Sequence, residues 1–242
     1  MQKTCFNFNT KIWKIEPCGN HLLVELRDSE TLSVEWKLVD IENEHILHTI
    51  THKESWWHSV AGTTKEHIVF HKFEQSKTPK ISSVLIYNVQ DYSFQLFNNT
   101  ALKEITQNRI ILQNQNGEEI TISSNTTYQP TITEPLVYHE DNQYFKDFEE
   151  LINSIDNQKI IKQCEYVENQ DFIIFSYFLP NSRNLSSNLI VINKEGLVIL
   201  REKLNDTLTG IVSNTFIIFN DKIVYIKNDK ELTIIGLSND AS

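Results

Sequence analysis

Three glutamates carry the side chains best suited to acid–base chemistry. Glu16, Glu104 and Glu165 occupy similar places near short apolar segments. A pair of carboxyl groups can cleave a glycosidic bond, one as acid and the other as base or nucleophile. Carboxylates gathered in one buried place repel one another, so at least one should titrate above the ordinary glutamate value. No surrounding motif identifies an enzyme. We therefore predict the three as ligand-binding residues and assign no catalytic residue.

The run Trp56-Trp57-His58 is the densest aromatic feature. Tryptophan stacks on sugars or peptides, and it is also large and favoured in protein cores. If a strand begins at Trp57, alternation sends Trp56 and Trp57 to opposite faces, and at least one of them packs in the core. Trp57 and His58 complete the predicted ligand-binding set.

Histidines are concentrated in the first third of the chain, and a metal site among them is not predicted. His48 with His52, and His67 with His71, are spaced four residues apart. That spacing suits zinc on a helix, but on a strand it separates the side chains by about 13 Å. His48 and His52 span a predicted strand end and turn, so the turn could bring these two side chains closer together. Phosphate-binding glycine loops, calcium loops and nucleophile motifs are also missing, so no cofactor is expected.

Charge and composition narrow the possible partners and the cellular location. The net charge is −10, which disfavours nucleic acid and anionic membranes as partners. No apolar leader run and no apolar stretch of membrane-spanning length occurs, so we expect a cytoplasmic protein and a monomer. The three cysteines form no disulfide framework, although one bridge remains open if the protein is exported.

The residues above must be positioned by β-strands, because β-branched and aromatic residues abound while alanine is scarce. Short apolar runs recur in groups, each group ending in a hairpin pattern. Four hairpin tips are predicted at Asn43-Glu44, Gln90-Asp91, Glu195-Gly196 and Asn228-Asp229. The first strands of five groups are predicted at Ile12 to Glu16, Trp57 to Ala61, Leu102 to Thr106, Ile160 to Val167 and Leu208 to Val212.

These strand starts are 45, 45, 58 and 48 residues apart, close to the repeat of a β-propeller blade, about 40–50 residues. We therefore predict an all-β, β-propeller-like fold of about five four-stranded antiparallel units in one domain, residues 1–242, with the third unit the least regular. Stacked units would cover both faces of runs such as 172–175 and 216–219. A β-sandwich is the alternative.

One segment has helical periodicity instead. In residues 144–155 the apolar side chains fall on one face, which predicts a short helix capped by Asp141 or Asn142. The preceding stretch, residues 126–139, contains two prolines and is either a poor outer strand or a long loop.

Units rich in Ile, Asn and Lys, with hairpin tips such as DIENEH and NVQDYS, resemble small uncharacterised bacterial β-propeller-like proteins. The resemblance spans nearly the whole chain and implies the same fold. It supplies neither a substrate nor a catalytic residue. The chain departs from WD-type propellers, because it lacks their Gly-His to Trp-Asp pairs.

The leading functional hypothesis is a non-catalytic binding or interaction module for an unknown protein or small-molecule ligand. The ligand is expected at a channel mouth formed by the starts of the inner strands, where units meet and leave a concavity. A carbohydrate-active hydrolase that uses the channel carboxylates is the alternative. A purely structural or assembly subunit is the third possibility.

Overall fold

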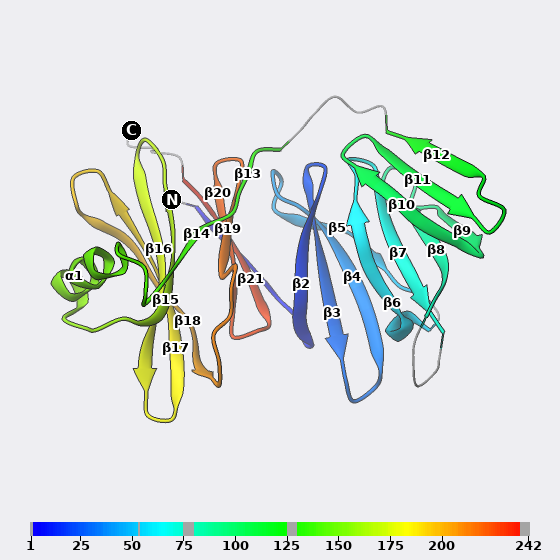
Figure 1. The fold of residues 1–242 in the computed structure, drawn as a ribbon. Helices are drawn as coiled ribbons and strands as arrows, with labels where there is room; N and C mark the ends of the chain where they lie inside the picture. The colour runs from blue at the N-terminus through cyan, green and yellow to red at the C-terminus, as the bar shows by residue number, and fades with distance from the viewer. Residues whose placement is uncertain (1, 53, 75–79, 125–129, 238–242) are drawn as a thin grey trace. The chain divides into compact units, whose positions relative to one another are not determined.

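The protein is all-β, and its described residues form one α-helix and five antiparallel sheets of three to five strands (Figure 1). The computed structural model describes residues 2–52, 54–74, 80–124 and 130–237, and 62% of these residues lie in strands. The chain divides into two compact units, Thr10–Pro130 and the pair of segments Met1–Asn9 and Thr131–Ser242. Ring closure into a propeller and a single domain over residues 1–242 stay predictions.

The unit Thr10–Pro130 contains three sheets and a 3-10 helix, η1 (Ser55–Trp57). The strands of each sheet follow one another in sequence order. The first sheet consists of β2 (Lys11–Cys18), β3 (His21–Asp28), β4 (Ser33–Asp40) and β5 (His45–Ile50). The second consists of β6 (His58–Thr63), β7 (His67–Phe73), β8 (Ile81–Asn88) and β9 (Phe94–Asn98). The third consists of β10 (Thr100–Thr106), β11 (Arg109–Asn114) and β12 (Glu119–Ser123).

The other unit contains two five-stranded sheets and the helix α1 (Phe145–Asp156). One sheet has the order β14 (Leu136–His139), β15 (Ile161–Glu168), β16 (Phe172–Asn181), β17 (Asn184–Asn193) and β18 (Val198–Leu208). The other has the order β1 (Lys3–Asn7), β21 (Glu231–Gly236), β20 (Lys222–Lys227), β19 (Phe216–Phe219) and β13 (Ile132–Thr133). The first and last strands of the described residues, β1 and β21, are therefore hydrogen-bonded neighbours.

The predicted first strands agree with the structure in four groups and fail in the fifth. Residues 208–212 were expected to begin a strand, but β18 ends at Leu208 and the following residues connect it to β19. The sheet is completed instead by β13 and by the N-terminal strand β1, which has no counterpart among the predicted strands. Strands that come from distant parts of the sequence leave no local signal. The repeat spacing alone therefore predicted a strand at residues 208–212 that the structure does not contain.

Continuous apolar runs are explained by sheets that are buried on both faces. In the middle sheet of the unit Thr10–Pro130, Phe70 and Tyr87 belong to a core shared with Trp36 and Leu38 of the first sheet. On the opposite face of the same strands, a second core joins Val69 and its neighbours to the third sheet through Ile110 and Leu112. A strand covered on both sides has no polar face and therefore loses the alternating pattern.

The run of residues 172–175 follows the same rule in the other unit. Phe172 and Ile174 belong to a core shared with the sheet of β19 to β21, whereas Ile173 and Phe175 pack toward α1. The prediction that this run is an inner strand covered on both faces is confirmed.

Asparagine and aspartate side chains close many of the tight turns. Oδ1 of Asp40 accepts hydrogen bonds from the backbone N–H groups of Glu42 and Asn43 at the first predicted hairpin tip. The side-chain oxygens of Asn114 and Asn193 do the same in their own hairpins. Such Asx turns replace backbone turns and tolerate residues that are not glycine, which accounts for a chain rich in Asn but poor in Gly.

One glycine is required by its surroundings. Gly19, in the turn between β2 and β3, has a φ of 57°, and a Cβ atom there would lie 2.6 Å from the backbone oxygen of Lys65. Any other residue at this position would therefore be strained and would also clash with backbone.

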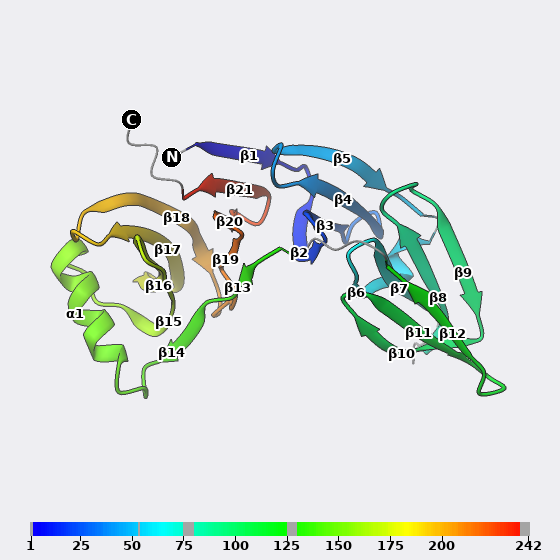
Figure 2. The same cartoon turned by 90° about the horizontal axis from the view of Figure 1, so that it is seen from above.

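The helix α1 lies where the sequence predicts it, within a residue at each end, and covers one face of the β14–β18 sheet (Figure 2). Phe145 and Ile152 are buried, while Phe148, Leu151 and Ile155 are partly buried against the same core. The residue before the helix, Tyr144, donates its backbone N–H to Oδ1 of Asn142. The prediction that Asp141 or Asn142 caps the helix is wrong, because Tyr144 is the N-cap residue and no side chain caps the first turn. Among the described residues, no helix has the length and apolarity needed to cross a bilayer.

The ring of Phe148 holds α1 against the sheet, with ring centroids 4.9 Å from Tyr138 and 5.1 Å from Phe175. We expect Phe148→Ala to lower the free energy of unfolding by about 1–3 kcal/mol, because it removes a packed but only partly buried ring. Urea unfolding followed by far-UV circular dichroism measures this loss. Leu197→Ala is the matched control, since Leu197 is 59% exposed, and it should cost less than about 0.5 kcal/mol. Equal effects of the two substitutions would show that α1 is only loosely attached.

Candidate functional site

The five predicted site residues are distributed over both units. Glu16, Trp57, His58 and Glu104 lie in the unit Thr10–Pro130, whereas Glu165 lies in the other. Glu16 on β2 forms an ion pair with Lys14, and Glu104 on β10 binds Arg109 with 2.6 Å between Oε1 and Nη2. In the described parts of the chain, no recorded hydrogen bond, ion pair or ring contact joins any two of the five. Their gathering at one channel mouth stays a prediction.

Glu165 anchors a loop. It is fully buried on β15, and its carboxylate accepts hydrogen bonds from the backbone N–H groups of Asn214 and Thr215, at 2.7 and 2.8 Å, and from Oγ1 of Thr215. Burial raises the pKa of Glu165, and the hydrogen bonds from Thr215 and Asn214 oppose that shift. The side chain thereby fixes the end of the segment between β18 and β19, where the predicted fifth first strand is missing.

Trp57 belongs to η1 and not to a strand, so the alternation argument for Trp56 and Trp57 was wrong. Strand β6 begins one residue later, at His58. His58 is buried, with 2% of its surface exposed, and its Nδ1 lies 3.1 Å from the backbone oxygen of Glu54. Burial and the nearby His52 lower the pKa of His58.

Arg27 is the centre of an aromatic cluster that the sequence did not reveal. Its guanidinium carbon lies 5.4 Å from the ring centroid of Trp13 and 5.6 Å from that of Trp56. We call this group of three side chains the Trp13–Arg27–Trp56 cluster. Arg27 Nη2 also donates to the backbone oxygen of His58 at 3.3 Å, which connects the cluster to the predicted site residues.

A buried carboxylate fixes the position of Arg27. Glu25, 3% exposed, binds Arg27 Nε through Oε1 and accepts a hydrogen bond from Trp36 Nε1 through Oε2, at 3.2 Å. A buried carboxylate is tolerated only when it is paired in this way. The guanidinium is therefore held in one orientation and its charge is compensated.

A β-bulge presents Trp13 at the surface. The pairing of β2 with β3 shifts between Ile12 and Lys14, so that Trp13 is the extra residue of an edge strand. Bulges redirect a side chain and recur next to functional sites. Trp13 is 63% exposed, the largest exposed fraction among the large hydrophobic residues described. Similar register shifts occur in β6, β10 and β15.

Two sequence signals could have indicated this cluster. Glu25 interrupts the apolar run of β3, where a charge must be paired. Arg27 follows it two residues later, on the same face of the strand. The contribution of Trp13 depends on a bulge, which is not visible in the spacing of apolar residues.

A cavity of about 470 Å³ lies elsewhere in the same unit and contains none of the predicted residues. Several of its polar lining groups already have partners. Ser82 Oγ donates to the backbone oxygen of Lys72, Thr100 Oγ1 to that of Asn98, and Gln113 Nε2 to that of Gly117. These three groups therefore already donate to the protein backbone.

Side chains that bind metals do not form a group of three or more within the described residues. His48 stacks on Tyr92 with centroids 4.3 Å apart, so it does not form the pair with His52 considered above. The three cysteines are free, and burial raises the pKa of both Cys18 and Cys164 to about 12. These two thiols are therefore unreactive.

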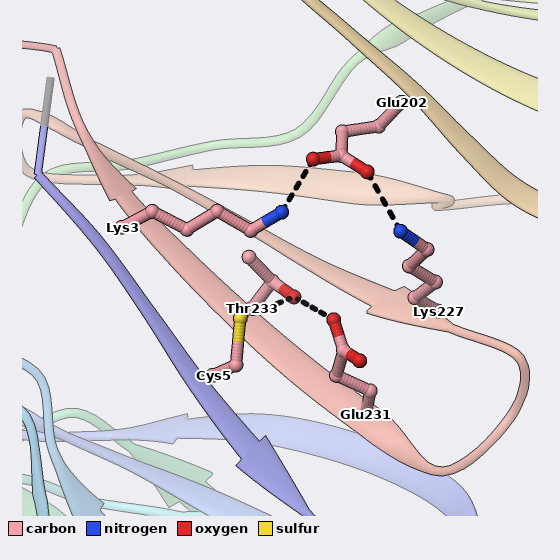
Figure 3. A network of polar contacts seen from close by, with 6 residues as sticks. All are labelled: Lys3, Cys5, Glu202, Lys227, Glu231 and Thr233. Carbon is pink, nitrogen blue, oxygen red and sulfur yellow. Dashed lines mark hydrogen bonds and ion pairs between the residues drawn. The ribbon is translucent and has the colours of Figure 1, made fainter.

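A charged network in the other unit joins β1 to its neighbours (Figure 3). Glu202 on β18 binds Lys3 of β1 and Lys227 of β20. On β21, which lies in the same sheet as β1 and β20, Oγ1 of Thr233 donates a hydrogen bond to Oε1 of Glu231 at 3.0 Å. The same Oγ1 lies 3.8 Å from Cys5 Sγ. Burial raises the pKa of Glu202, but the hydrogen bonds from Lys227 and Lys3 outweigh burial, and the pKa is lowered. The network serves to hold the N-terminal strand to the unit.

Two of the predicted glutamates, Glu165 and Glu104, should respond differently to neutralisation. Glu165→Gln places an amide group against backbone N–H donors and should lower the free energy of unfolding by about 1–3 kcal/mol. Glu104→Gln is the control, because its exposed ion pair with Arg109 should contribute less than about 1 kcal/mol. Chemical unfolding of both variants measures the difference. A Glu165→Gln protein as stable as the wild type would contradict the role as a loop anchor.

Acid should destabilise the unit Thr10–Pro130. Burial lowers the pKa of His21, His67 and His71, so the unfolded state binds more protons once the pH falls below about 6.5. The free energy of unfolding should decrease as the pH is lowered through that region. Tryptophan fluorescence measures it, because all four tryptophans lie in this unit.

Chelator should be present during these titrations, and His71→Gln should flatten the pH dependence. Replacement of the exposed His139, which lies in the other unit, by Gln should leave that dependence unchanged. A midpoint of unfolding that is equal at about pH 7.5 and about pH 5.5 would contradict the effect of these buried histidines.

Comparisons with known proteins give similarity without a function. A family model described as "Domain of unknown function (DUF4905)" matches residues 15–95, about a third of the chain. The match includes Glu25, Arg27, Trp56 and His58 but not Trp13. No curated protein matches the chain significantly. A solved structure, a member of the DUF4221 family from Bacteroides vulgatus, is 10% identical in sequence and has a TM-score of 0.31. The alignment covers 98% of this chain and 96% of that one.

Proposed function

We propose that the protein is a non-catalytic binding module whose ligand stacks on Trp13 in the Trp13–Arg27–Trp56 cluster. The observation that carries this proposal is a largely exposed tryptophan presented by a bulge over an arginine that Glu25 holds in place. Rigid aromatic groups supported from behind lose little conformational entropy when a ligand binds.

The chemistry of the cluster favours a ligand with a flat, weakly polar face. The charge of Arg27 is compensated by Glu25, so the cluster offers little net attraction to an anion. The net charge of −10 also disfavours anionic ligands. A neutral sugar ring fits these conditions, because it presents C–H groups to the indole and hydroxyl groups to the polar surroundings.

The hydrolase alternative receives no comparable support. Glycoside hydrolysis requires two carboxyl groups facing the same bond. Glu16 and Glu104 each bind a cation within their own sheet, and Glu165 is engaged by the backbone of residues 214 and 215. We therefore retain binding without catalysis as the proposed function.

Titration with neutral cello-, manno-, xylo- and galacto-oligosaccharides tests the proposal. NMR of protein labelled with ¹⁵N-tryptophan resolves the four indole N–H groups separately. We expect the signals of Trp13 and Trp56 to shift on binding, while that of Trp36, whose N–H donates to the buried Glu25, stays in place. Trp13→Ala should weaken binding by about tenfold, as expected for loss of an aromatic stacking contact.

Leu96→Ala is the matched control, because Leu96 is half exposed on β9 of the same unit and should not affect binding. Failure of all four oligosaccharide series to shift the Trp13 signal would refute the sugar proposal. Equal affinity of the wild type and Trp13→Ala would refute the location of the site.

A further inference from the structure

Strand β9 (Phe94–Asn98) is an edge strand, and among the described residues its outer side pairs with no other strand. It lies along the outer margin of the unit Thr10–Pro130 (Figure 2). An unpaired edge is a template for the addition of another strand, so proteins protect their edges with bulges, charged residues or short strands.

Strand β9 has none of these protections. Register shifts interrupt the pairing of the edge strands β2, β5, β6, β10 and β18. Strands β13 and β14 are short, β1 contains Lys3, and β12 contains Glu119. Strand β9 has no charged residue, no proline and no register shift against β8, and its Phe94 and Leu96 are 40% and 50% exposed. Of the described edges, β9 is therefore the most open to pairing.

Hydrogen bonds at both ends of β9 determine which of its residues bond to β8. At one end the N–H group of Asn88 donates to the backbone oxygen of Ser93 at 2.9 Å. At the other end the N–H group of Asn99 donates to the backbone oxygen of Ser82 at 3.3 Å. Along an antiparallel ladder, hydrogen-bonded pairs alternate with pairs that are not hydrogen-bonded. The odd-numbered residues of β9 therefore bond to β8, and the even-numbered residues direct their backbone groups outward.

The outward-directed residues are Phe94, Leu96 and Asn98. Their N–H and C=O groups are spaced to pair with one more antiparallel strand. Residues opposite each other in such a pair share a face, so the side chains of an added strand would contact the exposed side chains of Phe94 and Leu96.

Strand β9 is complementary to itself about a two-fold axis at Leu96. Antiparallel pairing in this register places Leu96 opposite Leu96 of a second copy and Phe94 opposite Asn98. All outward-directed groups of β9 are then used, in about six backbone hydrogen bonds. The chain has a net charge of −10, so two copies repel each other. Residues 93–99 contain no charged side chain, and two copies can therefore meet there without opposing like charges.

We propose that the protein forms a two-fold symmetric dimer in which β9 of one chain pairs with β9 of a second copy. A two-fold contact is complete after two copies, so it covers both edges and leaves neither open to further growth. Two short strands bury little area, so the dimer dissociates reversibly. The dimer departs from the monomer expected from the sequence. It does not involve the Trp13–Arg27–Trp56 cluster and is independent of the proposed binding function.

Analytical ultracentrifugation of the full, tag-free chain tests the dimer. We expect the mean molar mass to rise from one chain toward two as the protein concentration increases. Leu96→Lys should weaken association by at least about tenfold, because it places two positive charges beside the two-fold axis. Leu197→Lys is the matched control, since it adds the same charge at a leucine that is 59% exposed in the other unit, and it should leave association unchanged.

A molar mass of one chain at about 0.5 mM would overturn the proposal, whatever other strand β9 might accept. Assemblies that grow beyond two chains would also overturn it, and so would equal association of the wild type and Leu96→Lys.

Disulfide cross-linking tests the register. In a hydrogen-bonded antiparallel pair the two Cα atoms lie about 5.5 Å apart, within the range of a disulfide. The exposed Cys5 is first replaced by Ser, which leaves only the two buried cysteines. Oxidation of Leu96→Cys with diamide should then yield a covalent dimer. Asn98→Cys is the control, because its two copies would lie about 13 Å apart along the strands. Cross-linking of Asn98→Cys as fast as that of Leu96→Cys would overturn pairing about Leu96.

Discussion

The structure depends on central strands that are buried on both faces. In the unit Thr10–Pro130, the middle sheet contributes one set of side chains to the core with Trp36 and the alternate set to the core with Ile110. In the other unit, β16 divides its side chains in the same way between a neighbouring sheet and α1. Neither sheet could bury its apolar surface alone, so each requires a neighbour on either side. This requirement also confines polar chemistry to strand ends, turns and bulges.

Buried polar groups differ in how far they are paired: Glu25 and Glu165 are fully paired, whereas the buried hydroxyl groups of Tyr87 and Tyr225 have no hydrogen-bond partner in the described structure. Glu25 and Glu165 are both buried carboxylates, and each has a partner for both of its oxygens. Glu25 orients an arginine and a tryptophan side chain, whereas Glu165 binds the backbone of a loop. The same residue type therefore supports a candidate ligand surface in one unit and a structural anchor in the other. His58 differs from both, because its buried Nε2 has no such partner among the described residues.

The sequence predicted the elements that depend on local pattern. The strand groups, the hairpin tips closed by Asn193 and Asp40, and the amphipathic helix around Phe148 all leave a periodic or turn signal. The sequence did not predict the features that local periodicity does not describe. Strand β1 pairs with β21 across the whole chain, and Trp57 lies in a 3-10 turn that alternation does not describe. The candidate site was only partly predicted, because a bulge at Trp13 and a buried pair at Glu25 determine it.

The position of β1 has a consequence for biosynthesis. Strand β1 is synthesised before the strands β2 to β20, whereas its partner β21 is synthesised after them. Until β21 has been synthesised, residues 3–7 lack their partner strand, while the three sheets of residues 10–130 can already form from strands adjacent in sequence. Vectorial synthesis thus completes the inner segment of the chain before the outer one. The ion pair between Lys227 and Glu202 can form once β20 has been synthesised, whereas the ion pair between Lys3 and Glu202 forms when β1 is brought to the strands of residues 198–236.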